Sequence, residues 1–325
     1  MKKSFMIISL LCFLFPSCDF QRVVDIGEIP VNPHLVLNGL VYTDRDTSYF
    51  YITKSRPVYN DTIPIWDNKR GYEIIENADF TFLVNGEKRN VKYSLSDSAY
   101  IFVGRLHKSD KITIQVDHNG NEINSETLLP AAPQVISIDT VRVKRIQYGT
   151  PRDYMMFKLK MKDNPDKNDY YRLLVNVKYY SWIDGEVYSN SSGAYYTNDP
   201  VLTSGFTEEF ENSELGLVSS AYNYFSVFRD VIFQDEEYTL IFYVDINFLY
   251  MDNSYYDIEE WILSVRLQSI SEDLYKYYSS LQHSRSSSSD KVTDPVVVHS
   301  NINNGLGILG ACNEIKVFEY IKRKD

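Results

Sequence analysis

Residue types that often supply catalytic groups or cross-links are scarce in this 325-residue sequence, which has three cysteines and five histidines. Cys12 and Cys18 lie close to the N-terminus, so Cys312 is the remaining cysteine in the body of the chain. One spare thiol cannot form an internal disulfide framework. We therefore expect a fold that depends on its hydrophobic core, and a chain of this length has room for two domains.

Motifs of the common hydrolase and metal sites are also missing. The sequence has no G-x-S-x-G elbow and no H-E-x-x-H metal motif. The segment Asp163–Asp169, "DNPDKND", lacks the ligand spacing and the glycine of an EF-hand loop, and a polar hairpin turn explains it better. We predict a non-enzymatic protein with no catalytic residue, no metal site and no cofactor. Acidic pairs such as Glu259-Glu260 favour a solvated surface, although a hydrolase site assembled in space stays an alternative.

Basic residues are in the minority, with 33 Lys and Arg against 44 Asp and Glu. Removal of a leader that contains Lys2 and Lys3 leaves 31 basic residues and a net charge of −13. No basic cluster stands out that could follow a phosphate backbone, so we predict no nucleic-acid partner.

The N-terminus is typical of a bacterial lipoprotein signal. Two lysines precede the apolar run Phe5–Phe15, which is shorter than the roughly 20 residues that cross a bilayer. Leu14, Phe15 and Ser17 before Cys18 resemble a lipobox. We expect residues 1–17 to be a signal peptide, Cys18 to be lipidated, and residues 18–33 to form a tether. The sequence leaves open which leaflet of the outer membrane carries the anchor.

Short alternating runs rich in Val, Ile, Tyr, Phe and Thr fill the next 100 residues and predict strands. Asn85-Gly86 and Asn119-Gly120 separate such runs and predict type I′ hairpin turns. We interpret residues 34–128 as an immunoglobulin-like β-sandwich.

Two prolines in "LLPAAPQ" predict a linker at residues 129–134. Strand patterns then resume, so residues 135–325 are expected to form a second β-rich domain. One helix is predicted at about residues 271–283, where Leu274, Tyr277, Tyr278 and Leu281 fall on one face and Ser269 with Glu272 fits a capping box. The expected fold class is thus mainly β, with two antiparallel sandwich-type domains and a short helix near the C-terminus.

Gly305, Gly307 and Gly310 form a literal G-x-G-x-x-G. A dinucleotide loop needs a helix and a second strand after these glycines, and the fifteen remaining residues cannot supply both. We predict instead a structural role, in which the glycines allow tight turns or close backbone approach between a strand "PVVVHS" and a terminal strand "IKVFEYI".

The 27 tyrosines supply the remaining candidates for binding. A phenol ring has a flat apolar face and a polar edge, which suits stacking on sugars or packing against a partner. Half-buried strand positions explain many of these tyrosines. In the irregular region 188–224 we predict a binding surface formed by Tyr195, Tyr196, Tyr222 and Tyr224.

The C-terminal segments "ISEDLYKYYSSLQ" and "VHSNINNGLGILGA" resemble the signature of an uncharacterised lipoprotein family of Bacteroidetes, domain of unknown function 4249. Asn301, Gly305, Gly307 and Gly310 occupy the signature, and Leu309 stands where an aromatic residue is commoner. "HLVLNGLVYTD", "NADFTFLVNG", "LPAAPQVISID" and "DYYRLLV" add weaker matches, so the resemblance spans nearly the whole mature chain.

The resemblance implies an envelope lipoprotein of a family often encoded beside TonB-dependent outer-membrane receptors, and it brings no catalytic residue. We therefore predict an outer-membrane-anchored accessory or docking partner of such a receptor. Direct binding of a nutrient, either glycan or peptide, is the alternative, and a hydrolase is the third hypothesis.

Overall fold

The computed structural model describes residues 33–55, 73–147, 150–164, 169–183, 186–192, 195–203, 218–219, 223–246, 258–287 and 297–323. His34–Asp325 forms one compact unit. The predicted signal peptide, Cys18 and nearly all of the tether lie outside the described residues. No helix in the described part of the chain is long and apolar enough to cross a membrane.

The four longest of the first eight strands follow the predicted alternation closely. In Leu35–Tyr42 buried residues alternate with half-buried ones, as expected for a strand with one face on a core. At both Asn-Gly sites the two residues have positive φ, with Asn85 at 53° and Gly86 at 83°, so the hairpin predictions are confirmed. The strands are β1 (Leu35–Tyr42), β2 (Thr47–Lys54), β3 (Asp79–Val84), β4 (Glu87–Arg89), β5 (Val91–Ser94), β6 (Ala99–Val103), β7 (Lys111–His118) and β8 (Asn121–Leu128).

The remaining strands are longer on average, and the two helices and a 3₁₀ turn lie among them. The strands are β9 (Gln134–Gln147), β10 (Thr150–Lys162), β11 (Tyr170–Ile183), β12 (Glu186–Ser192), β13 (Tyr196–Thr197), β14 (Val218–Ser219), β15 (Val227–Arg229), β16 (Glu237–Asp245), β17 (Ile258–Ile270) and β18 (Leu306–Arg323). The helical segments are α2 (Pro200–Thr203), η2 (Asp230–Ile232) and α4 (Glu272–Ser287). The mainly β fold class with a helix near the C-terminus is confirmed.

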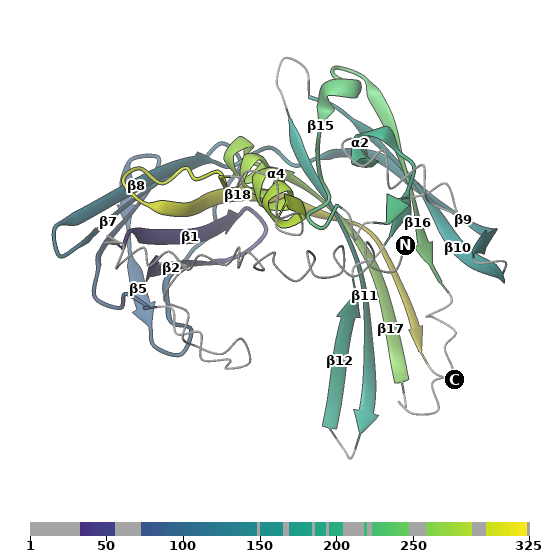
Figure 1. The fold of residues 1–325 in the computed structure, drawn as a ribbon, viewed down its shortest axis with the longest axis horizontal. Helices are drawn as coiled ribbons and strands as arrows, with labels where there is room; N and C mark the ends of the chain where they lie inside the picture. The colour runs from purple at the N-terminus through teal and green to yellow at the C-terminus, as the bar shows by residue number, and fades with distance from the viewer. Residues whose placement is uncertain are drawn as a thin grey trace, which may run out of the picture. The chain divides into compact units, whose positions relative to one another are not determined.

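One long sheet contains strands from both sides of the predicted linker. Its order is β12-β11-β17-β18-β1-β2-β6-β5, with β15 paired to β11 off this path. The last strand, β18, runs parallel to β1, and Leu37 lies opposite Gly307 while Leu40 lies opposite Gly310. Figure 1 shows β18 beside β1, with α4 close to both. The parallel pair departs from the all-antiparallel pairing expected from the sequence.

The two largest hydrophobic cores among the described residues lie against different parts of this long sheet. The first joins β1, β2 and β6 to the sheet β4-β3-β7-β8, with Leu37, Phe50 and Phe82 wholly buried. The second joins β11 and β17 to the sheet β14-β13-β16-β10-β9, with Phe157 and Phe242 stacked at 4.9 Å between ring centroids. Strands from both predicted domain ranges share the long sheet. The two-domain division stays a prediction.

Helix α4 begins and ends later than its sequence pattern indicates. Ser269 lies in β17 and is buried, so it does not cap the helix; instead the Tyr275 N–H donates to the Ser271 carbonyl at 3.0 Å. The helix continues through part of the serine-rich segment to Ser287. The strand predicted for "PVVVHS" is wrong where it is described, because residues 297–300 form an irregular segment.

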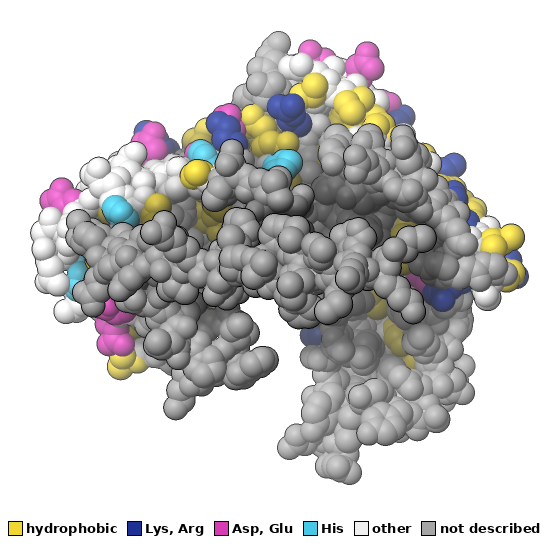
Figure 2. All heavy atoms as spheres, viewed as in Figure 1, with side chains coloured by type: hydrophobic (Ala, Val, Ile, Leu, Met, Phe, Trp, Pro, Cys, Tyr) yellow, Lys and Arg dark blue, Asp and Glu magenta, His cyan; other side chains and the backbone are white. Residues whose placement is uncertain are grey.

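Charged side chains on the face drawn in Figure 2 are mixed in sign. Described Lys and Arg side chains lie among acidic and hydrophobic ones on this face.

Candidate functional site

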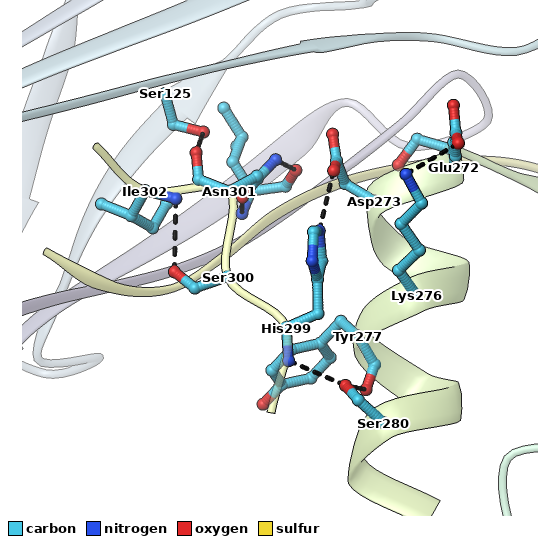
Figure 3. A network of polar contacts seen from close by, with 12 residues as sticks. Ser125, Glu272, Asp273, Lys276, Tyr277, Ser280, His299, Ser300, Asn301 and Ile302 are labelled. Carbon is cyan, nitrogen blue, oxygen red and sulfur yellow. Dashed lines mark hydrogen bonds and ion pairs between the residues drawn. The ribbon is translucent and has the colours of Figure 1, made fainter. Parts of the chain in front are cut away.

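The irregular segment before β18 is fixed by Asn301. Its side-chain amide donates to the Leu309 carbonyl at 2.9 Å and its side-chain oxygen accepts from the Leu309 N–H at 2.9 Å. The Ser125 hydroxyl donates to the Asn301 carbonyl at 2.9 Å, which joins the segment to β8 (Figure 3). Asn301, predicted as a structural signature residue, thus closes the turn that leads the chain into β18.

The same segment is attached to helix α4 at two places. A ring nitrogen of His299 lies 2.8 Å from the Asp273 carboxylate in the first turn of the helix. The His299 N–H donates to the Ser280 hydroxyl at 2.8 Å, further along the helix (Figure 3). These contacts hold α4 in a fixed position over the long sheet.

Two glycines of the signature allow β18 to pass close to β1 and α4, so the predicted close approach occurs, but with other partners than the expected strand "PVVVHS". Gly307 has φ of +109°, and a Cβ there would lie 2.1 Å from the Leu37 carbonyl oxygen. At Gly310 a Cβ would lie 2.8 Å from side-chain atoms of both Leu274 and Leu40. The glycines therefore bring β18 against β1 and under α4. They open a strand rather than a helix, which is not the geometry of a nucleotide loop.

A cavity of about 440 Å³ lies where α4 meets β1 and β2, and we call it the tyrosine pocket. Its volume falls in the range typical of small-molecule sites. Apolar side chains of α4 and β18 line it together with five tyrosines. The lining residues are Asn38, Gly39, Leu40, Tyr42, Arg45, Thr47, Tyr49, Tyr51, Leu274, Tyr277, Tyr278 and Ile308.

Three polar side chains of the tyrosine pocket make no hydrogen bond with another described residue: Asn38 on β1, Thr47 on β2 and Arg45 in the turn between them. Arg45 is exposed, and its guanidinium carbon lies 3.6 Å from the ring centroid of Tyr42. The lining contains no carboxylate. The pocket therefore combines ring faces with hydrogen-bonding capacity that the described protein groups leave unused.

Burial shifts the pKa of several groups in or next to the tyrosine pocket. Burial raises the pKa of Tyr42 and of Tyr278 above the usual tyrosine range, although the Arg172 guanidinium opposes the effect at Tyr278. Burial also raises the pKa of the Cys312 thiol to about 12. A thiol that stays protonated is a poor nucleophile, so Cys312 acts as a packing residue.

The four tyrosines of the predicted binding surface do not come together as one surface. Tyr195 is 2 % exposed and packs in the second core against Phe242, so its assignment to a surface is wrong. Tyr196 is half-buried against Tyr154, whereas Tyr224 is 61 % exposed beside Phe225. Tyr222 lies outside the described residues.

The described acidic residues of "DNPDKND", Asp163 and Asp169, form hydrogen bonds beside the second core. Asp163 is wholly buried and accepts from the Tyr171 hydroxyl at 3.2 Å and the Asp235 N–H at 3.1 Å. The Asp169 N–H donates to the Asp230 carboxylate at 2.6 Å. No group of three or more His, Cys, Asp or Glu among the described residues is placed to hold a metal ion.

The tyrosine pocket was missed in the sequence, although one signal for it was present. The strand "TSYFYITK" alternates Tyr49 and Tyr51 with the buried Phe50 and Ile52, so the two tyrosines share the opposite face. The sequence did not reveal that this face was left partly open beside α4.

A family model described as Domain of unknown function (DUF4249) matches residues 22–316. Comparison with curated proteins gives no match.

Proposed function

We propose that this chain, which belongs to the DUF4249 family, is a non-enzymatic binding protein of the bacterial envelope that works as an accessory partner of a TonB-dependent receptor. The tyrosine pocket is the observation that carries the binding role, because its unused polar groups and exposed rings have the chemistry of a recognition site. The receptor as partner is supported by the genomic neighbourhood that the family resemblance implies.

Lipidation of Cys18 and attachment to the outer membrane are part of this proposal, supported by the lipobox-like sequence before Cys18. Replacing Cys18→Ser should abolish incorporation of a palmitate analogue and release the protein from the membrane fraction. Cys12→Ser is the matched control, since Cys12 belongs to the expected leader. Label that persists in the Cys18→Ser variant would refute this anchor.

The receptor partnership is tested by purifying the tagged full-length protein from mildly solubilised native membranes. We expect a β-barrel receptor in stoichiometric amount by mass spectrometry. Crosslinking in intact cells before solubilisation controls for loss of a weakly bound partner in detergent. A protein that is recovered alone from both preparations would contradict the accessory role.

Direct capture of a nutrient is the second candidate function, and the volume and lining of the tyrosine pocket favour it specifically. A soluble ligand should then change the tyrosine fluorescence of the purified protein, which docking to a receptor alone does not require. The two functions are compatible, because an accessory protein can hold a ligand close to its transporter.

A further inference from the structure

Strand β1 contributes side chains to the tyrosine pocket but no free backbone groups. Strand β1 lies inside the long sheet and pairs with β18 on one side and β2 on the other. Its backbone N–H and C=O groups are therefore used by neighbouring strands. Peptides that bind by strand addition need a free sheet edge, so the pocket favours a ligand recognised through ring faces and side-chain hydrogen bonds.

The exposed rings of the pocket lie on one face of β2. Tyr49 is 40 % exposed and Tyr51 is 43 % exposed, and the residue between them, Phe50, points into the first core. Side chains two residues apart on a strand are separated by roughly 6.6–6.8 Å. A sugar ring also has an apolar C–H face and a polar rim, and this matches the flat face and polar edge of tyrosine.

Arg45 gives the tyrosine pocket a single positive charge. Its guanidinium is held over the Tyr42 ring and forms no ion pair with a described carboxylate. A guanidinium recognises a carboxylate through two parallel hydrogen bonds. One guanidinium balances the charge of a monoanion, and Asp44 and Asp46 on either side of Arg45 disfavour a dianion such as phosphate.

We propose that the tyrosine pocket binds a saccharide that carries a carboxylate group. Arg45 donates to the carboxylate, Tyr49 and Tyr51 stack on sugar rings, and Asn38 and Thr47 bind ring hydroxyls. This inference rests on the proposed binding role of the pocket and adds the chemical class of its ligand.

Isothermal titration of the full-length protein in detergent with three probes tests the ligand class. The probes are cellobiouronic acid, which is a disaccharide with a single carboxylate, its methyl ester, and N-acetyl-Ala-Phe, called Ala-Phe below. The ester keeps both sugar rings but loses the negative charge, while the dipeptide keeps a carboxylate and an aromatic ring without a sugar. We expect cellobiouronic acid to bind at least about tenfold more tightly than either of the others. The ester lacks the charge-assisted hydrogen bonds to Arg45, which are roughly twice as strong as neutral ones, and the peptide lacks the sugar rings and hydroxyls.

Variants of the lining residues show where the probe binds. Arg45→Gln should remove the preference for the acid over the ester, whereas Arg89→Gln, an exposed arginine on β4, should preserve it. Tyr49→Ala should weaken binding of both sugars by about fivefold or more, within the range for an aromatic contact. Tyr320→Ala is the matched control, since Tyr320 is 39 % exposed on β18 but does not line the pocket.

Equal affinity for acid and ester, or a preference that survives Arg45→Gln, would overturn the carboxylated class. If the ester or Ala-Phe bound as tightly as the acid, and if Tyr49→Ala weakened that binding, the pocket would remain a binding site. Only the proposed ligand class would then be refuted. If no probe bound, the inference would fall, while recovery of a receptor from native membranes would still support the accessory function.

Discussion

Arg45 and Asp199 are both charged side chains next to tyrosines, but the protein surrounds them in opposite ways. Asp199 is 5 % exposed and accepts from the Tyr238 hydroxyl at 2.6 Å and from the N–H groups of Val201 and Ile241 at 3.1 and 3.0 Å. Arg45 is exposed, lies over a ring and makes no hydrogen bond with the described residues.

The comparison separates polar groups that build the fold from those that can meet a ligand. Inside the second core Asp163 and Asp199 accept hydrogen bonds from donors of their own chain, because an unsatisfied buried charge is costly. In the tyrosine pocket the side chains of Asn38, Thr47 and Arg45 make no hydrogen bond with the described residues, so they are able to bond a molecule from outside. Substitutions of residues of the two kinds should therefore differ in their effect on the stability of the protein.

The largest expected difference is between two tyrosines. Tyr195→Ala should destabilise the protein by about 3–5 kcal/mol, because it empties a buried aromatic site against Phe242. Tyr49→Ala should change stability by no more than about 0.5 kcal/mol, since that ring is exposed at the surface. Urea unfolding of both variants measures the difference. Similar losses for the two would show that Tyr49 is a core residue and would remove it from the binding argument.

A second comparison uses the two charged residues. Asp199→Ala leaves the Tyr238 hydroxyl and the N–H groups of Val201 and Ile241 without their acceptor, so we expect a loss of about 2–3 kcal/mol in the free energy of unfolding. Arg45→Gln should leave stability unchanged within about 0.5 kcal/mol. A large loss for Arg45→Gln would mean that Arg45 supports the fold, and its role in ligand binding would then need another explanation.

Local signals in the sequence predicted the elements of this fold well. Asn85-Gly86 specifies its own turn, and the apolar spacing of Leu274 and Tyr278 specifies a helix, because both depend on neighbours close in the chain. The parallel pairing of β1 with β18 joins residues at opposite ends of the described chain, such as Leu37 and Gly307. No local pattern encodes that pairing, so the tyrosine pocket built upon it could not be located from the sequence.

The tyrosines show the same limit in the candidate site. Alternation in β2 places Tyr49 and Tyr51 on one face, but whether that face is open depends on where α4 lies. Tyr195 stands in a polar, irregular stretch, and yet tertiary packing buries it. Tyrosine is the kind of residue that lines the pocket, but which of the 27 tyrosines do so depends on the fold.

The support of the pocket by the signature segment can be tested with two asparagines. Asn301→Ala removes both side-chain bonds to Leu309, so we expect a loss of about 1–2 kcal/mol and weaker ligand binding as α4 loosens. Asn303→Ala is the control, because its side chain bonds the exposed Asn124 amide and should cost no more than about 0.5 kcal/mol. Equal effects in thermal unfolding would contradict a special role for Asn301.

The smallest expected effect concerns a buried acid, Asp230. Burial is the main cause that raises the pKa of its carboxyl, and the nearby carboxylates of Asp163 and Asp169 add to the effect, while the Asp169 N–H opposes it. One oxygen, Oδ1, has no hydrogen-bond partner among the described residues. Because the pKa of Asp230 is higher in the folded than in the unfolded state, protonation of its carboxyl stabilises the fold. This stabilisation is lost as pH rises through the folded-state pKa.

Asp230→Asn should therefore make the protein more stable than the parent chain at pH 7, since the amide carries no charge at any pH. The advantage should shrink as pH falls towards the unfolded aspartate pKa of about 3.9, where the parent carboxyl is also neutral. Urea unfolding at several pH values measures this advantage, with Asp79→Asn as the control, since Asp79 is exposed at the start of β3. A variant that is less stable than the parent at pH 7 would show that the Asp230 charge supports the fold, which contradicts the cost of burial expected from its unpartnered Oδ1.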